Sequence, residues 1–153
     1  MRSRVRFAML ATSGVLAAGA FAACGDDDDE DTESAAAPAE VALTADEYSF
    51  ELSENPGPET KKVTVENVGE EPHAMIFARI NEGFTLEEAN DLQGRKGSAE
   101  IVADEVEVGP GETKSSGVGG PLTPGNYGML CPLSTEDGES HFELGQRLEF
   151  TIE

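Results

Sequence analysis

The chain has 153 residues and carries 31 acidic side chains against ten lysines and arginines, a formal net charge of −21. So acidic a protein is repelled by nucleic acid and by anionic lipid head groups, which argues against both as partners. With no tryptophan, two histidines and two cysteines, few residues are available to carry chemistry.

The first 23 residues have the pattern of an export signal. Three arginines lie within the first six residues, and an uncharged apolar run extends from Phe7 to Ala23. The small residues before Cys24 resemble the lipobox of bacterial lipoproteins, in which the cysteine is lipidated after cleavage. We therefore expect a signal peptide over residues 1–23, lipidation of Cys24, and a mature protein on the outer face of the cell membrane or in the periplasm. Two alternatives stay open: a retained membrane-spanning helix, for which the run is short, and cleavage without lipid.

A low-complexity acidic segment follows the export signal. Residues 24–40 contain eight acidic side chains and no large apolar one. Such a segment cannot bury enough surface to fold, and its like charges extend it. We expect a disordered tether over residues 24–40 that holds one folded domain, residues 41–153, away from the membrane. If Cys24 carries lipid, Cys131 has no disulfide partner, and an unpaired cysteine in an exported protein indicates a reactive or metal-bound thiol.

The domain shows the sequence period of β-strands. Apolar and polar side chains alternate over residues 48–52, 63–66 and 147–153, as expected of strands with one face in a core. The runs 74–80 and 101–108 are more uniformly apolar. Clusters of proline, glycine and asparagine separate these runs and indicate turns.

One segment of the domain has helical signals instead. Thr85-Leu86-Glu87-Glu88 has the form of a capping box, and Gly94 is a suitable stop, so we expect a short helix from Leu86 to Gln93. About seven short strands with one short helix inserted predict an all-β, Greek-key β-sandwich.

The residues that could carry chemistry are His73, Cys131 and His141. His73 follows a strand end and turn that contain Asn-Val-Gly at residues 67–69. Cys131 ends the run Pro-Gly-Asn-Tyr-Gly-Met-Leu-Cys at residues 124–131. His141 directly precedes the last predicted strand, so a cysteine and a histidine flank the final loop.

Several enzyme classes lack their motifs in this chain. The sequence contains no Gly-x-Ser-x-Gly nucleophile elbow, no His-Glu-x-x-His zinc motif, and no glycine-rich phosphate loop between a strand and a helix. We therefore expect no enzymatic activity of its own.

The order and surroundings of these three residues resemble the blue-copper cupredoxins, both plastocyanin-like and azurin-like. That family places a histidine after an Asn-x-Gly strand end, a cysteine after a Pro-Gly-x-Tyr strand, and then a second histidine and an axial ligand. The resemblance implies one type 1 copper held by His73, Cys131 and His141, with Gln146 in the axial position as in stellacyanin-like members. Two imidazoles and a thiolate with a weak fourth ligand suit copper in both of its redox states.

The resemblance further implies a membrane-tethered electron-transfer protein whose partner is a basic redox protein or a copper-dependent enzyme. Nine residues separate Cys131 from His141, a longer loop than small blue-copper proteins have, and Thr135, Asp137 and Gly138 within it indicate a mobile turn. If that loop swings away, His141 does not reach the metal. Two other functions stay open: a copper carrier or buffer, and a metal-free cupredoxin-like interaction module. Met129 is expected in the core rather than on the metal.

Overall fold

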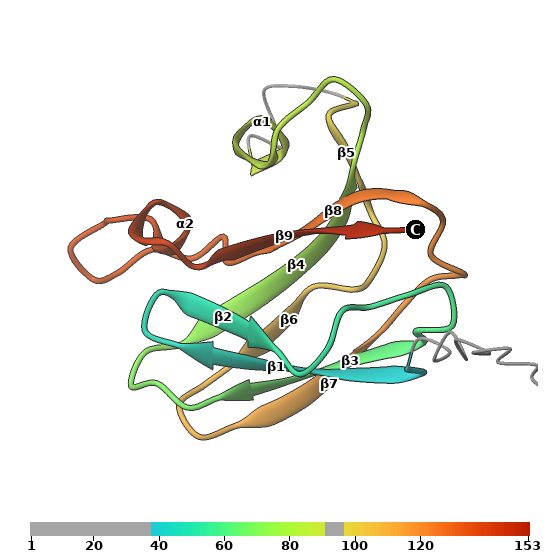
Figure 1. Ribbon diagram of the computed structural model, residues 1–153. Coiled ribbons are helices and arrows are strands. Elements are labelled where there is room, and N and C mark those ends of the chain that lie inside the picture. Colours follow the sequence, from blue (N-terminus) through green and yellow to red (C-terminus); the bar gives the residue numbers. More distant parts are fainter. Residues whose placement is uncertain (1–37, 91–96) are drawn as a thin grey trace, which may run out of the picture. The chain divides into compact units, whose positions relative to one another are not determined.

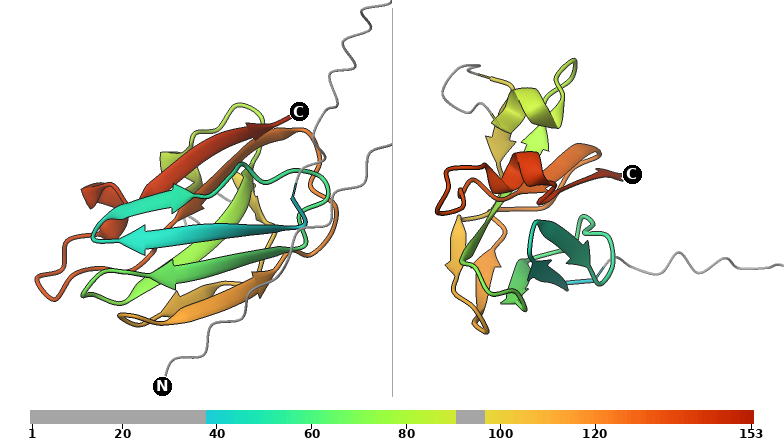
Figure 2. Two further views of the ribbon diagram at one scale, coloured as in Figure 1. Left: turned by 60° about the horizontal axis from the view of Figure 1, so that its bottom comes forward. Right: turned by 90° about the vertical axis from the view of Figure 1, so that its left-hand side faces the viewer.

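The computed structural model describes residues 38–90 and 97–153, which form two facing β-sheets (Figures 1 and 2). The first sheet has the strand order β2-β1-β3-β7, with bounds Ser49–Leu52, Glu40–Asp46, Lys62–Asn67 and Thr113–Gly117. The second has the order β5-β4-β8-β9, with bounds Ala99–Ile101, His73–Ile80, Gly125–Leu130 and Arg147–Ile152, and β6 (Val106–Val108) also pairs with β4. The predicted β-sandwich is confirmed.

Strand pairing is antiparallel throughout these sheets except between β1 and β3, which run parallel. Apolar side chains from both sheets meet between them, and every member of this inner cluster is buried. It includes Leu43, Val63, Met75, Phe77 and Met129. The alternation of apolar and polar side chains in the sequence therefore corresponds to strands that direct one face into this inner cluster.

Strand β4 is buried on both faces, which explains why its sequence run is uniformly apolar. Side chains such as Met75 and Phe77 point into the inner cluster. Ile76 and Ile80 belong to a second cluster, which is completed by Leu86, Ala89, Leu130 and Phe142. A strand covered on two sides has no solvent face on which polar residues could alternate.

The described residues contain nine strands rather than the seven expected. The more uniformly apolar run 101–108 does not form one continuous strand: β5 ends at its first residue and pairs with Ala78–Ile80, whereas β6 takes up its last three residues and pairs with His73–Met75. Between them the backbone bridges Ala103 to Val118. The eight-residue strand β4 is long enough to pair with both short strands along one edge.

Two short helices occur in the described residues, one more than expected. Helix α1 (Leu86–Asn90) begins at the predicted capping box: the Glu88 N–H donates to Thr85 Oγ1 at 3.3 Å, and the Thr85 N–H donates to Glu88 Oε2 at 3.1 Å. Its predicted end at Gln93 lies outside the described residues. Helix α2 (His141–Leu144) was not predicted, because four residues are too few to show a helical period.

The export signal, Cys24 and most of the predicted tether also lie outside the described residues. Strand β1 begins at Glu40, one residue before the predicted start of the domain. The carbonyls of Pro38 and Ala39 accept hydrogen bonds from Thr60 and Lys61 at 2.9 and 2.8 Å. Among residues 38–90 and 97–153, no helix is long and apolar enough to cross a membrane.

Candidate metal centre

Three elements bring the scarce residues together at one end of the second sheet. His73 is the first residue of β4, Cys131 follows the last residue of β8, and His141 is the first residue of α2. Because β4 and β8 are antiparallel neighbours with Ile76 opposite Leu130, the start of one strand lies beside the end of the other. The Ala74 N–H donates to Cys131 Sγ at 3.3 Å across this pair.

The donor atoms of the three residues converge. His141 Nδ1 lies 3.4 Å from His73 Nδ1 and 3.6 Å from Cys131 Sγ. One donor atom from each residue lies within 4.8 Å of the other two, and all three side chains are buried. His141 and the first histidine pack edge to face, with ring centroids 5.3 Å apart.

This cluster fits a metal ion bound in a trigonal set. Bonds of about 2.0–2.3 Å from nitrogen and sulfur donors to one central ion place the donors about 3.5–3.7 Å apart, close to the separations of 3.4 and 3.6 Å in the structure. Each neutral imidazole carries one proton, so the crowded lone pairs of His73, Cys131 and His141 cannot all be satisfied by hydrogen bonds among themselves. His73 Nε2 also has no hydrogen-bond partner among the described residues. A cation that accepts the inward lone pairs resolves the crowding.

Burial shifts the pKa values of two of the donors, His73 and Cys131. Loss of hydration, and then the proximity of His141, lowers the pKa of His73, which favours the neutral imidazole that binds metals. Burial raises the pKa of the Cys131 thiol, and hydrogen bonds from the Ala74 and Leu133 backbones oppose this only in part. Without a cation the thiol stays protonated, so a bound metal must stabilise the thiolate.

The long loop between Cys131 and His141 is closed by its own hydrogen bonds. The Thr135 N–H donates to Glu139 O at 2.9 Å, and the Gly138 N–H donates to Thr135 O at 2.9 Å. The His141 N–H donates to Leu133 O at 2.9 Å, which folds the loop back onto its own start. In this structure the loop therefore does not swing away, contrary to the concern raised by its length, and His141 reaches the other two donors.

Gln146 lies beside the three donors and is fully buried. Its Oε1 is 3.1 Å from His141 Nδ1, and its Nε2 donates to Asp46 O at 3.0 Å. That second hydrogen bond fixes the amide with its oxygen towards the cluster. Met129 is fully buried in the inner apolar cluster, where it was expected.

The outer side of the centre opens onto an acidic hollow of about 440 Å³. His141 lines it together with Leu133, Ser134, Thr135, Pro72 and four glutamates, Glu70, Glu71, Glu107 and Glu136. The surface next to His141 is therefore strongly negative.

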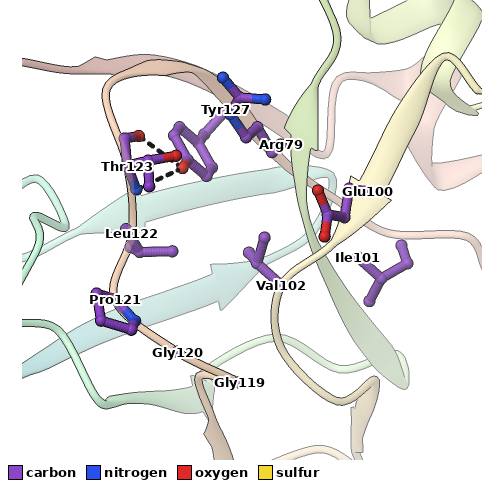
Figure 3. Close-up of a pocket in the computed structure, with 10 residues that line it drawn as sticks. All are labelled: Arg79, Glu100, Ile101, Val102, Gly119, Gly120, Pro121, Leu122, Thr123 and Tyr127. Carbon is purple, nitrogen blue, oxygen red and sulfur yellow. Dashed lines mark hydrogen bonds between the residues drawn. The ribbon is translucent and has the colours of Figure 1, made fainter.

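A second hollow, of about 280 Å³, lies at the other end of β4 (Figure 3). Arg79, Glu100 and Tyr127 line it, and none of the four candidate ligands does. The Tyr127 hydroxyl donates to Thr123 O at 2.7 Å and accepts from the Thr123 N–H at 3.1 Å, so it stabilises the loop before β8. This hollow is separate from the metal centre.

Comparison with known proteins agrees with this architecture. No protein-family model and no curated protein sequence matches the chain. Dithionite-reduced auracyanin from the photosynthetic bacterium Roseiflexus castenholzii superposes with a TM-score of 0.55 at 17% identity, over 76% of this chain and 98% of that one. Auracyanin B superposes with a TM-score of 0.50 at 17% identity, over 74% and 88%. Auracyanin A from Chloroflexus aurantiacus, described as a "blue" copper protein, has a TM-score of 0.49 at 17% identity, over 74% and 98%.

The domain has the cupredoxin fold. Within this cupredoxin-like domain, the sequence identified the buried cluster but not two residues that surround it. Tyr48 packs edge to face on His141, with ring centroids 5.3 Å apart. Glu71 Oε2 lies 3.2 Å from His141 Nε2. Glu71 is only two residues from His73, but nothing in the sequence indicated that it contacts the other histidine.

Proposed function

We propose that this protein is a membrane-tethered, extracytoplasmic carrier of single electrons with one type 1 copper. One observation carries the proposal: two imidazoles and one thiol, all buried, converge with donor separations of 3.4 and 3.6 Å. His73, Cys131 and His141 would hold the metal, and Gln146 would be the axial ligand. Copper bound there would supply a one-electron couple between Cu(II) and Cu(I).

The protein's part is to keep the donors in place in both redox states. His73 and Cys131 lie at the ends of two paired strands, and the Ala74 N–H anchors the sulfur. The amide of Gln146 is tied to Asp46 O. Donors held by sheet hydrogen bonds and a close-packed core move little when an electron arrives or leaves, which favours rapid transfer. An amide oxygen is harder than a thioether, so Gln146 would favour Cu(II) and lower the reduction potential.

An electron carrier also needs a route to its partner. His141 lines the acidic hollow, so it is the candidate ligand nearest to a docking partner. Four glutamates around that hollow would attract a positively charged redox protein and raise its association rate at low ionic strength. We infer a basic partner, whose binding weakens as salt is added.

Titration of the purified domain with Cu(II) tests the metal centre. We expect one equivalent to bind with an intense visible band from thiolate-to-copper charge transfer, and Cys131→Ser to abolish the band. Met129→Leu is the matched control, because it conserves volume at a buried neighbouring position and should keep the band. A wild-type protein that binds no copper, or shows no such band, contradicts the proposal. Reversible reduction of the copper form separates an electron carrier from a copper store.

Membrane tethering is tested through Cys24. Expressed in a bacterium that processes lipoproteins, the full chain should partition with membranes, and Cys24→Ser should release it or block its maturation. Unchanged membrane partitioning of that variant would exclude lipidation as the anchor.

A further inference from the structure

The outer edge of the His141 ring faces a carboxylate. His141 is 1% exposed, and the side chain of Glu71, at 35%, lies between its Nε2 atom and solvent with a separation of 3.2 Å. The contact lacks the alignment of a hydrogen bond, and Nε2 has no other partner among the described residues. At 3.2 Å the Glu71 carboxylate oxygen is within hydrogen-bond distance of this nitrogen.

Backbone contacts hold Glu71 at this place. Asn67 Nδ2 donates to Glu71 O at 2.8 Å and to Val108 O at 3.0 Å, and Asn67 Oδ1 accepts the Gly69 N–H at 2.9 Å. One buried amide therefore organises the whole turn before His73. The fold therefore fixes the backbone from which the Glu71 side chain reaches His141.

Tyr48 packs edge to face on the His141 ring, beside Glu71. It is the one described non-glycine residue with a positive φ, 59°, a conformation that costs free energy in most side chains. Burial, and then the charge and hydrogen bond of Glu71, raise the pKa of Tyr48. The Glu70 N–H donates to Glu47 Oε1 and so ties the Tyr48 turn to the Glu71 turn. A Cβ at Gly69 would lie 2.5 Å from Glu47 Oε1, so a larger residue there would displace the Glu47 carboxylate.

Two acceptors compete for the single proton of the neutral His141 ring. Gln146 Oε1, 3.1 Å from Nδ1, favours a proton on Nδ1, where it would block metal binding. Glu71 favours a proton on Nε2, which leaves the Nδ1 lone pair directed at His73 and Cys131. Carboxylates that accept the outer N–H of a ligating histidine fix its tautomer and strengthen it as a donor.

We propose that Glu71 is a positioning residue for the metal centre: it holds His141 in the Nε2–H tautomer and, with Tyr48, covers the outer edge of the ring. This inference rests on the proposed copper function. A stronger imidazole donor stabilises Cu(II) more than Cu(I), so Glu71 lowers the reduction potential as well as tightening copper binding.

Glu71→Gln, Glu71→Ala and the control Glu70→Gln test this role. Glu70 is the adjacent glutamate, is exposed and has no contact with His141, so its substitution removes the same charge from the same hollow. We expect Glu71→Ala to weaken Cu(II) binding by about ten- to a hundredfold in chelator competition. Glu71→Gln, which keeps an acceptor oxygen but no charge, should fall between Glu71→Ala and wild type. Both should raise the reduction potential by more than Glu70→Gln does.

If Glu71 only stabilised the fold, its substitution would not change the rate at which the His141 Nε2–H exchanges with water. In the diamagnetic Cu(I) form, the Nε2–H of His141 should exchange slowly with water in the wild type and in Glu70→Gln, and rapidly in Glu71→Ala. The inference is overturned if Glu71→Ala and Glu71→Gln match Glu70→Gln in affinity and potential, or if only their thermal midpoints change. A wild-type protein without a thiolate-to-copper band overturns the proposed function and this inference together, whereas a wild-type band with unaltered Glu71 variants overturns this inference alone.

Discussion

The two faces of the sheet formed by β4 and β8 are both buried, but the inner face carries the candidate metal ligands and the outer face carries apolar packing. On the inner face, Met75 and Met129 belong to the same buried cluster as Cys131, which lies beside the two histidines. On the outer face, Leu130 and Phe142 pack in the second cluster, beneath α1. Adjacent residues therefore have different roles. Cys131 belongs to the inner cluster, whereas Leu130 packs in the second cluster on the outer face. In the same way, the candidate ligand His141 is followed by Phe142, which packs in the second cluster.

This division explains how a long loop can hold a ligand firmly. At the end of β8 the period of two sends the neighbouring side chains of Leu130 and Cys131 to opposite faces, so an apolar anchor lies next to the sulfur without occupying its space. The outer cluster then fixes both ends of the loop, Leu130 before it and Phe142 after it. The four predictions that follow perturb one face or the other, from the largest expected effect on stability to the smallest.

Phe142→Ala removes the outer anchor beside His141. Phe142 is 4% exposed, and Arg147 lies over its ring at 4.5 Å, so we expect a loss of about 3 kcal/mol in the free energy of unfolding. Copper affinity should fall as well, because His141 loses its support. Denaturant unfolding and copper titration measure the two effects. Wild-type copper affinity in a destabilised variant would show that the inner face holds His141 without the outer anchor.

Gly128→Ala overpacks the outer face away from the centre. A Cβ at Gly128 would lie 2.5 Å from Leu86 Cδ1 and 3.3 Å from Leu148 O, so the buried Leu86 side chain must move, at a cost of about 1–3 kcal/mol. The visible copper band should not change, since none of the candidate ligands moves. Gly120→Ala is the control, because its Cβ would meet nothing within 4 Å. Equal stability of the two variants would contradict the close packing of α1 on β8.

Thr85→Ala removes half of the capping box of α1. The hydroxyl of Thr85 accepts the Glu88 N–H, and loss of such a cap costs about 1 kcal/mol. The thermal midpoint should fall by a few degrees, with the copper spectrum unchanged. A spectral change would show that α1 is coupled to the metal centre.

Gln146→Met acts on the inner face and should alter the reduction potential more than the stability. A thioether favours Cu(I) relative to an amide oxygen, so the potential should rise. The variant loses the hydrogen bond to Asp46 O, so a modest fall in stability accompanies this change. Voltammetry of the copper form provides the measurement. An unchanged potential would mean that Gln146 is not an axial ligand.

Much of this architecture could be predicted from local patterns. The alternating run before the chain end and the capping box at Thr85 gave a strand and a helix where the structure has β9 and α1. The bounds of β5 and β6 could not be predicted from the run 101–108, because they depend on which parts of β4 the two strands pair with. Helix α2 was missed since its four residues are held by packing and by the turn at Gly145 rather than by helical propensity.

The sequence by itself determined which residues could bind a metal, because His73, Cys131 and His141 have almost no competitors of their kind, and it determined that the domain is built of strands. Only the tertiary structure decided that the three meet, that the nine-residue loop closes, and that Glu71 and Tyr48 cover His141. The reason is physical. Strand periodicity depends on near neighbours in the chain, whereas the place of His141 depends on Leu133 and on the packing of Phe142, contacts that no short sequence window contains.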